Sequence, residues 1–149
     1  MLGLQAPEQT GKPESGGNAL PSLDTARDSR TVLVIDDEAA LLTIISDVLE
    51  ESGYRVLTAS DGPAGLEILR SEQSVDLLIT DIRLPKGMNG REVAQAARTT
   101  RPCLKILFMT GYAGSAFDGV DPLAVGTELM TKPFDLLRLV DRVHRLIES

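Results

Sequence analysis

The sequence has little of what several common classes of function require. None of its 149 residues is tryptophan, and only one, Cys103, is cysteine. A single cysteine excludes an internal disulfide and a cysteine-based metal site. Basic residues are also few, because 15 Lys and Arg stand against 22 Asp and Glu, for a net charge of −7. Non-specific nucleic-acid binding needs a basic surface, so the composition argues against that class.

Long apolar segments are missing as well. No apolar run in the sequence approaches the roughly 20 residues of a membrane-spanning helix. The N-terminus lacks the basic flank followed by an apolar stretch that marks a signal peptide. We therefore expect a cytoplasmic protein without a membrane span. Aromatic residues make up only 3% of the chain, so its core must be built from Leu, Ile, Val and Ala.

Two regions of different composition divide the chain. Residues 1–29 are rich in Pro, Gly and polar residues and show no periodicity. Such a composition buries too little apolar surface to offset the conformational entropy of the chain, so we interpret this region as a flexible N-terminal tail. Residues 30–149 carry the periodic apolar segments and are numerous enough for one domain with its own core.

Short apolar runs alternate with stretches of helical periodicity from residue 31 onward. Val32–Ile35 is typical of a strand buried on both faces, whereas Asp61, Gly62 and Pro63 favour the start of a helix. The expected strands are 32–35, 54–59, 75–80, 104–109 and 128–131, and the expected helices are 40–49, 61–69, 90–99 and one starting at 133–135. This alternation predicts an α/β fold with a doubly wound, five-stranded parallel sheet of order 2-1-3-4-5.

Polar residues of one chemical theme follow four of these strands. Asp36 and Asp37 come after the first strand, Asp81 after the third, Thr110 after the fourth and Lys132 after the fifth. The carboxyl ends of parallel strands meet at one edge of the sheet, which is where doubly wound folds bind their ligands. Three carboxylates gathered at this edge would repel one another, and Mg²⁺ together with the Lys132 ammonium would compensate them.

This set of groups suits the transfer of a phosphoryl group to a carboxylate. Asp81 ends the middle strand and would be the nucleophile, with Mg²⁺ and Lys132 neutralising the phosphoryl oxygens. The Thr110 hydroxyl can donate a hydrogen bond to the product, while Asp36 and Asp37 would hold the metal or its water. An aspartate after a strand is often only a helix N-cap, but capping does not require four strand ends to coincide.

Four motifs resemble those of response-regulator receiver domains. They are Val34-Ile35-Asp36-Asp37-Glu38, Thr80-Asp81-Ile82-Arg83-Leu84-Pro85, Phe108-Met109-Thr110-Gly111-Tyr112 and Thr131-Lys132-Pro133-Phe134. The resemblance covers about residues 31–149 and implies a flavodoxin-like receiver fold in a two-component regulatory system. It implies that Asp81 is phosphorylated to a 4-aspartylphosphate and that Mg²⁺ is bound by Asp36, Asp37 and Asp81. Asp37 would be a direct ligand, Asp36 would hold the metal or its bound water, and the backbone carbonyl of Arg83 would be the third protein ligand after Asp37 and Asp81.

The resemblance also implies that Thr110 is the switch hydroxyl, that Lys132 is the active-site lysine and that the bond to Pro133 is cis. Leu129 stands where the family usually has an aromatic switch residue, and Tyr112 is a candidate substitute. The segment 111–126 contains three further glycines and a proline, so we expect a degenerate fourth helix that is short, irregular or mobile.

The implied function is a signalling switch and not an enzyme with a separate substrate. A histidine kinase or phosphotransfer protein would supply the phosphoryl group, and a downstream protein partner would read the altered surface. A receiver fragment of a hybrid histidine kinase and a phosphorelay intermediate are alternatives. A Mg²⁺-dependent phosphatase with an aspartyl nucleophile is another alternative. Such enzymes usually have a second Asp two residues after the nucleophile, and this chain has Arg83 there, which argues against this class. A binding module that works unphosphorylated is a further alternative, for which Leu129 leaves room.

The final helix carries the only histidine, His144, among three arginines. Arg138, Arg142 and Arg145 recur at helical spacing, which is typical of a charged, solvated helix face. We interpret His144 as part of that surface, with partner docking as the alternative for the arginines.

Overall fold

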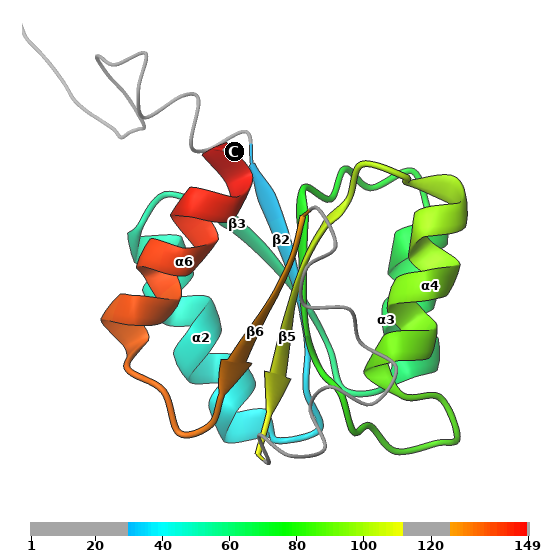
Figure 1. Cartoon of the computed structure of the whole chain (residues 1–149), viewed down its shortest axis with the longest axis horizontal. Helices are drawn as coiled ribbons and strands as arrows, with labels where there is room; N and C mark the ends of the chain where they lie inside the picture. Colours follow the sequence, from blue (N-terminus) through cyan, green and yellow to red (C-terminus); the bar gives the residue numbers. More distant parts are fainter. Residues whose placement is uncertain (1–29, 112–125, 149) are drawn as a thin grey trace, which may run out of the picture.

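The structure, a computed structural model, describes residues 30–111 and 126–148. The tail expected at 1–29, Tyr112 and most of the expected degenerate helix lie outside the described residues. Five strands and four helices alternate in the described part of the chain (Figure 1). No described helix has the length and apolar character needed to cross a membrane.

The expected α/β architecture is confirmed. The strands are β2 (Thr31–Ile35), β3 (Arg55–Ala59), β4 (Leu77–Asp81), β5 (Lys105–Thr110) and β6 (Thr127–Thr131). The helices are α2 (Ala39–Glu51), α3 (Gly62–Arg70), α4 (Gly90–Thr100) and α6 (Leu136–Glu148). The strands form one parallel sheet of order β3-β2-β4-β5-β6, which is the predicted order 2-1-3-4-5. Helices α2 and α6 cover one face of the sheet, and α3 and α4 cover the other (Figure 1).

Alternation along β2 shows why its apolar run is continuous. Val32 and Val34 belong to the core cluster beneath α2 and α6, whereas Leu33 and Ile35 belong to the cluster beneath α3 and α4. All four side chains are fully buried. A central parallel strand has an apolar layer on each side, so both of its faces must be hydrophobic. These two layers fix the sheet rigidly and so position its carboxyl edge.

Side chains cap the N-termini of α3 and α4 at the carboxyl edge of the sheet. The Asp61 carboxylate accepts a hydrogen bond of 2.8 Å from Ala64 N at the start of α3. This backbone donor lowers the pKa of Asp61, against the opposing effect of burial, and the nearby Lys86 ammonium lowers it further. At α4, Asn89 and Glu92 form a reciprocal capping box.

Two residues of α6 show that the predicted solvated face is wrong in part. The His144 Nδ1 atom lies 3.1 Å from the hydroxyl of Tyr54, whose side chain is buried. Arg142 donates to Glu128 Oε1 at 3.0 Å and to the Leu129 carbonyl at 3.3 Å. Both contacts join residues far apart in the sequence, so helical spacing alone could not predict them.

A first prediction concerns Arg101, whose guanidinium holds the end of α3. It donates to the backbone carbonyls of Leu69, Ser71 and Gln73, at 2.9, 3.2 and 2.6 Å. Arg101→Ala should lower the free energy of unfolding in urea by about 2 kcal/mol, because hydrogen bonds from a charged donor are lost. The exposed neighbour Arg70 serves as the control, and Arg70→Ala should cost about 0.5 kcal/mol or less. Equal effects of the two substitutions would contradict this account.

Candidate functional site

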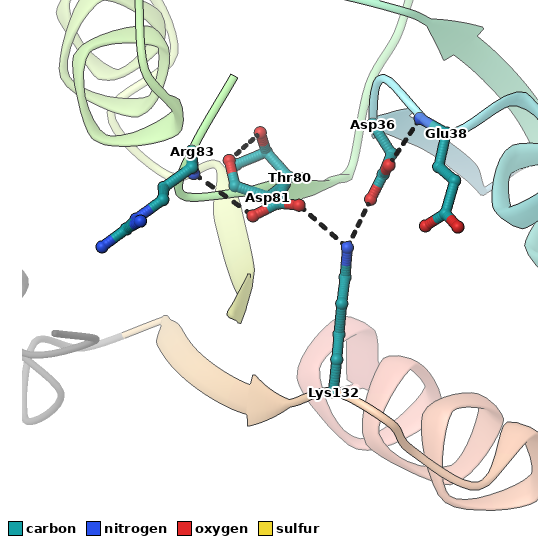
Figure 2. Close-up of polar contacts among 6 residues, drawn as sticks. All are labelled: Asp36, Glu38, Thr80, Asp81, Arg83 and Lys132. Carbon is teal, nitrogen blue, oxygen red and sulfur yellow. Dashed lines mark hydrogen bonds and ion pairs between the residues drawn. The ribbon is translucent and has the colours of Figure 1, made fainter. Parts of the chain in front are cut away.

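Three side chains from three strand ends converge at the carboxyl edge of the sheet (Figure 2). Asp36 follows β2, Asp81 ends β4 and Lys132 follows β6. The Lys132 ammonium lies 2.9 Å from Asp36 Oδ2 and 2.8 Å from Asp81 Oδ2, so it bridges the two carboxylates. The Asp36 side chain is 0% exposed, that of Asp81 15% and that of Lys132 22%. The site is therefore sheltered, with Asp81 reachable from solvent.

Backbone donors fix the other oxygen of each carboxylate. Asp36 Oδ1 accepts from Glu38 N at 2.8 Å, and Asp81 Oδ1 accepts from Arg83 N at 3.2 Å (Figure 2). In each carboxylate, one oxygen thus accepts a hydrogen bond from a backbone N–H group, and the other accepts from the Lys132 ammonium. Contacts to both oxygens fix the orientation of each carboxylate.

A third carboxylate completes an acidic cluster that could hold a metal ion. Asp36, Asp37 and Asp81 each offer an oxygen, and these oxygens all lie within 4.8 Å of one another. Oxygens on opposite sides of one octahedral Mg²⁺ ion are about 4.2 Å apart, given Mg–O distances near 2.1 Å. The described cluster therefore fits a small hard cation after a minor adjustment. The role of the Arg83 carbonyl as a ligand stays a prediction.

Thr110 and Lys132 are joined through the main chain. Thr110 is buried at the end of β5, and its carbonyl accepts a hydrogen bond of 2.7 Å from Lys132 N. The Lys132–Pro133 peptide bond is cis, as the resemblance implies. The sheet thus places all five residues named from strand ends at one edge, although their individual roles stay predictions.

Sequence reasoning missed the support beneath Asp81. The Thr80 side chain is fully buried, and its hydroxyl donates to the Asp81 carbonyl at 2.9 Å (Figure 2). A Cβ atom on Gly90, the first residue of α4, would lie only 2.1 Å from the same carbonyl oxygen. Gly90 N also donates to the Ile82 carbonyl at 2.9 Å. The start of α4 therefore packs directly against the backbone of Asp81.

The loop between β4 and α4 is attached to α3 by two contacts. The Lys86 ammonium lies 3.3 Å from Asp61 Oδ2, and Lys86 has a left-handed backbone with φ of 67°. A Cβ atom on Gly62 would lie 2.8 Å from the Met88 carbonyl, so the loop backbone touches α3. These contacts link the loop that follows Asp81 to α3, which lies beside α4 over the same face of the sheet.

A second prediction follows from the charge of Lys132. Burial lowers its pKa, but hydrogen bonds and attraction from Asp81 and Asp36 outweigh burial and raise the pKa above its usual value. The ammonium therefore contributes stability that is complete below the unfolded-state pKa of about 10.4 and is lost as pH rises through the folded-state pKa. Without divalent cations, the difference in unfolding free energy between wild type and Lys132→Met should shrink above about pH 10.4.

The measurement is urea unfolding from neutral to alkaline pH. Lys86→Met is the control, because the Lys86 side chain is 69% exposed and its removal leaves the bridge intact. This control should retain the alkaline loss of stability seen in wild type. A constant difference between wild type and Lys132→Met across the alkaline range would contradict the bridge as a source of stability.

The fold and the site together define a class, an α/β domain with an acidic cluster and a lysine at the carboxyl edge of its sheet. Residues 32–144 match the family model described as the response regulator receiver domain. The chain belongs to this family.

Relatives and solved structures agree with that assignment. The chain is 37% identical over 120 residues to the alkaline phosphatase synthesis transcriptional regulatory protein PhoP of Bacillus subtilis, a match covering 80% of this chain and 49% of PhoP. It is 31% identical over 118 residues to the response regulator receiver protein CpdR of Brucella abortus, a match covering 79% of this chain and 97% of CpdR. The chain therefore spans about half the length of PhoP but nearly all of CpdR.

One of the solved structures similar to this chain contains Mg²⁺. The response regulator TrrA of Thermotoga maritima, in complex with Mg²⁺-BeF, has a TM-score of 0.67 and 30% sequence identity to this chain. The match covers 78% of this chain and 98% of the TrrA chain.

Proposed function

We propose that this chain is a phospho-accepting signalling switch of the cytoplasm. Asp81 receives the phosphoryl group from a phosphohistidine of a histidine kinase or phosphotransfer protein. The observation that carries the proposal is the position of Asp81 between two oriented groups, the Lys132 ammonium at 2.8 Å and Arg83 N at 3.2 Å. A carboxylate held in this way is positioned for attack on an incoming phosphorus atom.

In the proposed transfer, an oxygen of Asp81 forms a P–O bond while the P–N bond of the donor breaks. The electron pair of that P–N bond stays on the donor imidazole. Lys132 lies close enough to Asp81 to bind the transferred oxygens, and the Thr110 hydroxyl is proposed to donate to one of them.

The acidic cluster is proposed to hold Mg²⁺. Asp36, Asp37 and Asp81 would provide carboxylate oxygens, and the Arg83 carbonyl would provide a further ligand. The bound ion would supply positive charge to the phosphoryl oxygens. The mutual distances within the cluster and the Mg²⁺-BeF complex of TrrA support this choice of metal.

Phosphorylation is proposed to alter the surface through the Lys132–Thr110 connection. A phosphoryl group on Asp81 adds negative charge beside Lys132. Because Lys132 N donates to the Thr110 carbonyl at 2.7 Å, displacement of one strand end is transmitted to the other. A downstream protein partner would recognise the resulting surface.

A third prediction tests this function with a small phosphodonor. The full chain incubated with acetyl phosphate and Mg²⁺ should gain one phosphoryl group, measured as a mass increase. The group should be released in alkali, as an acyl phosphate is, and should be absent when EDTA removes the metal. Uptake that is equal in EDTA, or a phosphate that survives alkali, would contradict the proposed function.

A further inference from the structure

The loop between β4 and α4, residues 82–89, has a strained backbone at its centre. Lys86 has a φ of 67°, and Gly87 after it has a φ of 77°. In the described part of the chain, Lys86 is the only residue other than glycine that has a left-handed backbone. This conformation is unfavourable for a residue with a Cβ atom, and it persists only where the surrounding structure holds it. The loop is therefore expected to be held by contacts with another element.

One of these contacts is an ion pair with a carboxylate that is itself fixed. The Lys86 ammonium lies 3.3 Å from Asp61 Oδ2. The other oxygen of Asp61 accepts from Ala64 N at 2.8 Å, and the Asp61 side chain is only 11% exposed. Asp61 is thus oriented by the start of α3, whereas most of the Lys86 side chain is in solvent. The ion pair therefore ties a long side chain of the loop to a fixed point on α3.

The second contact is made by the backbone of the loop. A Cβ atom on Gly62 would lie 2.8 Å from the Met88 carbonyl oxygen and 3.1 Å from Met88 Cβ, so the loop approaches α3 as closely as a glycine permits. The Met88 side chain packs against the core cluster beneath α3 and α4. Lys86 and Met88 therefore hold the loop against the N-cap of α3 and its first residue.

The proposed metal site depends on this loop because Arg83 belongs to it. Arg83 N donates to Asp81 Oδ1 at 3.2 Å (Figure 2), and the Arg83 carbonyl is a proposed ligand of the cation. Lys86 follows Arg83 by three residues. A displacement of Lys86 from α3 therefore carries over to the backbone of Arg83, and through its N–H group to the orientation of the Asp81 carboxylate.

We propose that the ion pair between Lys86 and Asp61 is a latch that holds the loop in the conformation that binds Mg²⁺. Both are positioning residues, since neither is among the proposed ligands of the cation. The latch rests on the proposed function, because it acts through the Mg²⁺ site of the acidic cluster. Loss of the ion pair removes part of the support for the left-handed backbone, so the loop leaves α3 in a fraction of the molecules. The apparent affinity for Mg²⁺ then falls in proportion to the fraction that keeps the loop on α3.

Titration of the full chain with MgCl₂, followed by its amide resonances in NMR, measures the Kd for Mg²⁺ without a phosphodonor. Asp61→Asn and Lys86→Met should each raise this Kd about threefold, because an exposed ion pair changes an equilibrium constant by no more than about fivefold. Asparagine is as good an N-cap as aspartate, so Asp61→Asn removes the ion pair and keeps the cap of α3. Lys86→Arg keeps the charge and should bind Mg²⁺ like wild type.

The direction of these changes separates the latch from a general effect of charge. A general effect has opposite signs, because loss of the Asp61 carboxylate would weaken cation binding whereas loss of the Lys86 ammonium would strengthen it. The latch predicts that both substitutions weaken binding. The double variant, Asp61→Asn with Lys86→Met, should bind no more weakly than either single variant, since the two changes remove the same contact.

Gly62→Ala tests the backbone contact without removing either charge. The added methyl group would displace the Met88 carbonyl from α3 and should raise the Kd for Mg²⁺ as well. Arg101→Ala is the control for loss of stability, because Arg101 holds the opposite end of α3. This control should lower the free energy of unfolding in urea but leave the Kd of the folded protein unchanged.

The same factor should appear in phosphorylation by acetyl phosphate. The Mg²⁺ concentration that gives half the maximal rate should rise about threefold in Asp61→Asn. The rate at saturating Mg²⁺ should stay near that of wild type, because the bound cation selects the molecules whose loop lies on α3.

A wild-type Kd in Asp61→Asn, or tighter Mg²⁺ binding by Lys86→Met, would overturn the latch. So would a Kd that rises as much in Arg101→Ala as in Gly62→Ala, because loss of stability alone would then explain both. In each of these cases, a wild-type chain that binds Mg²⁺ and takes up phosphate only in its presence still supports the proposed function. A wild-type chain that does not bind Mg²⁺ would instead overturn both the latch and the proposed metal site.

Discussion

Asp81→Asn is expected to abolish phosphorylation by acetyl phosphate in the presence of Mg²⁺, with a rate lowered by a factor on the order of 10³ or more. An amide is a far weaker nucleophile than a carboxylate, and the variant also removes one charge from the proposed metal site. The fold should survive, because the carbonyl oxygen of the introduced amide can still accept from Arg83 N. The measurement is the rate of mass increase by one phosphoryl group.

Asp76→Asn is the matched control. Asp76 immediately precedes β4, the strand that Asp81 ends, and its carboxylate accepts from Thr31 N at 2.8 Å. The same chemical change at the far end of this strand should leave the rate of phosphorylation unchanged. Labelling of Asp81→Asn at the wild-type rate would show that another residue accepts the phosphoryl group.

Most of the architecture could be predicted from the sequence because its signals are local. A strand with apolar layers on both faces needs an uninterrupted apolar run, and Val32–Ile35 is one. The boundaries were less accurate where a side chain intervenes. The third strand was predicted to begin at residue 75, but it begins at Leu77. Asp76, just before it, donates from its backbone N–H to the Thr31 carbonyl and accepts from Thr31 N with its carboxylate. The last helix begins at Leu136, because the Asp135 carboxylate accepts from Leu137 N.

The candidate site was predictable at the level of residues but not of contacts. Parallel strands bring their carboxyl ends together whatever the side chains, so Asp36, Asp81 and Lys132 had to be near one another. That Lys132 bridges both carboxylates depends on where β6 lies relative to β2, which no local pattern contains. The Thr80 hydroxyl was missed for a related reason, since a threonine in an apolar strand gives no sign of which carbonyl it reaches.

The second large effect is expected at Gly90, where α4 meets the backbone of Asp81. Gly90→Ala would put a methyl carbon 2.1 Å from the Asp81 carbonyl oxygen and 3.0 Å from Thr80 Oγ1. The Asp81 oxygen belongs to the backbone of a central strand and cannot rotate away, so the start of α4 must move. Alanine gains at most about 1 kcal/mol over glycine from helix propensity, whereas overpacking typically costs about 1–3 kcal/mol, and a 2.1 Å approach to a backbone oxygen places this substitution at the upper end. We therefore expect a net loss of about 2 kcal/mol in the free energy of unfolding.

Gly111→Ala is the control for this substitution. Among the described residues, its Cβ would have no neighbour within 4 Å, and its φ is not in the left-handed region, so its effect should stay within about 0.5 kcal/mol. Urea unfolding of both variants gives the comparison, and phosphorylation by acetyl phosphate adds a functional readout. The start of α4 packs against the backbone carbonyl of Asp81 and so positions that residue. Gly90→Ala should therefore also slow phosphate uptake under conditions where the variant is folded. A Gly90→Ala protein as stable and as reactive as wild type would show that this close contact does not position Asp81.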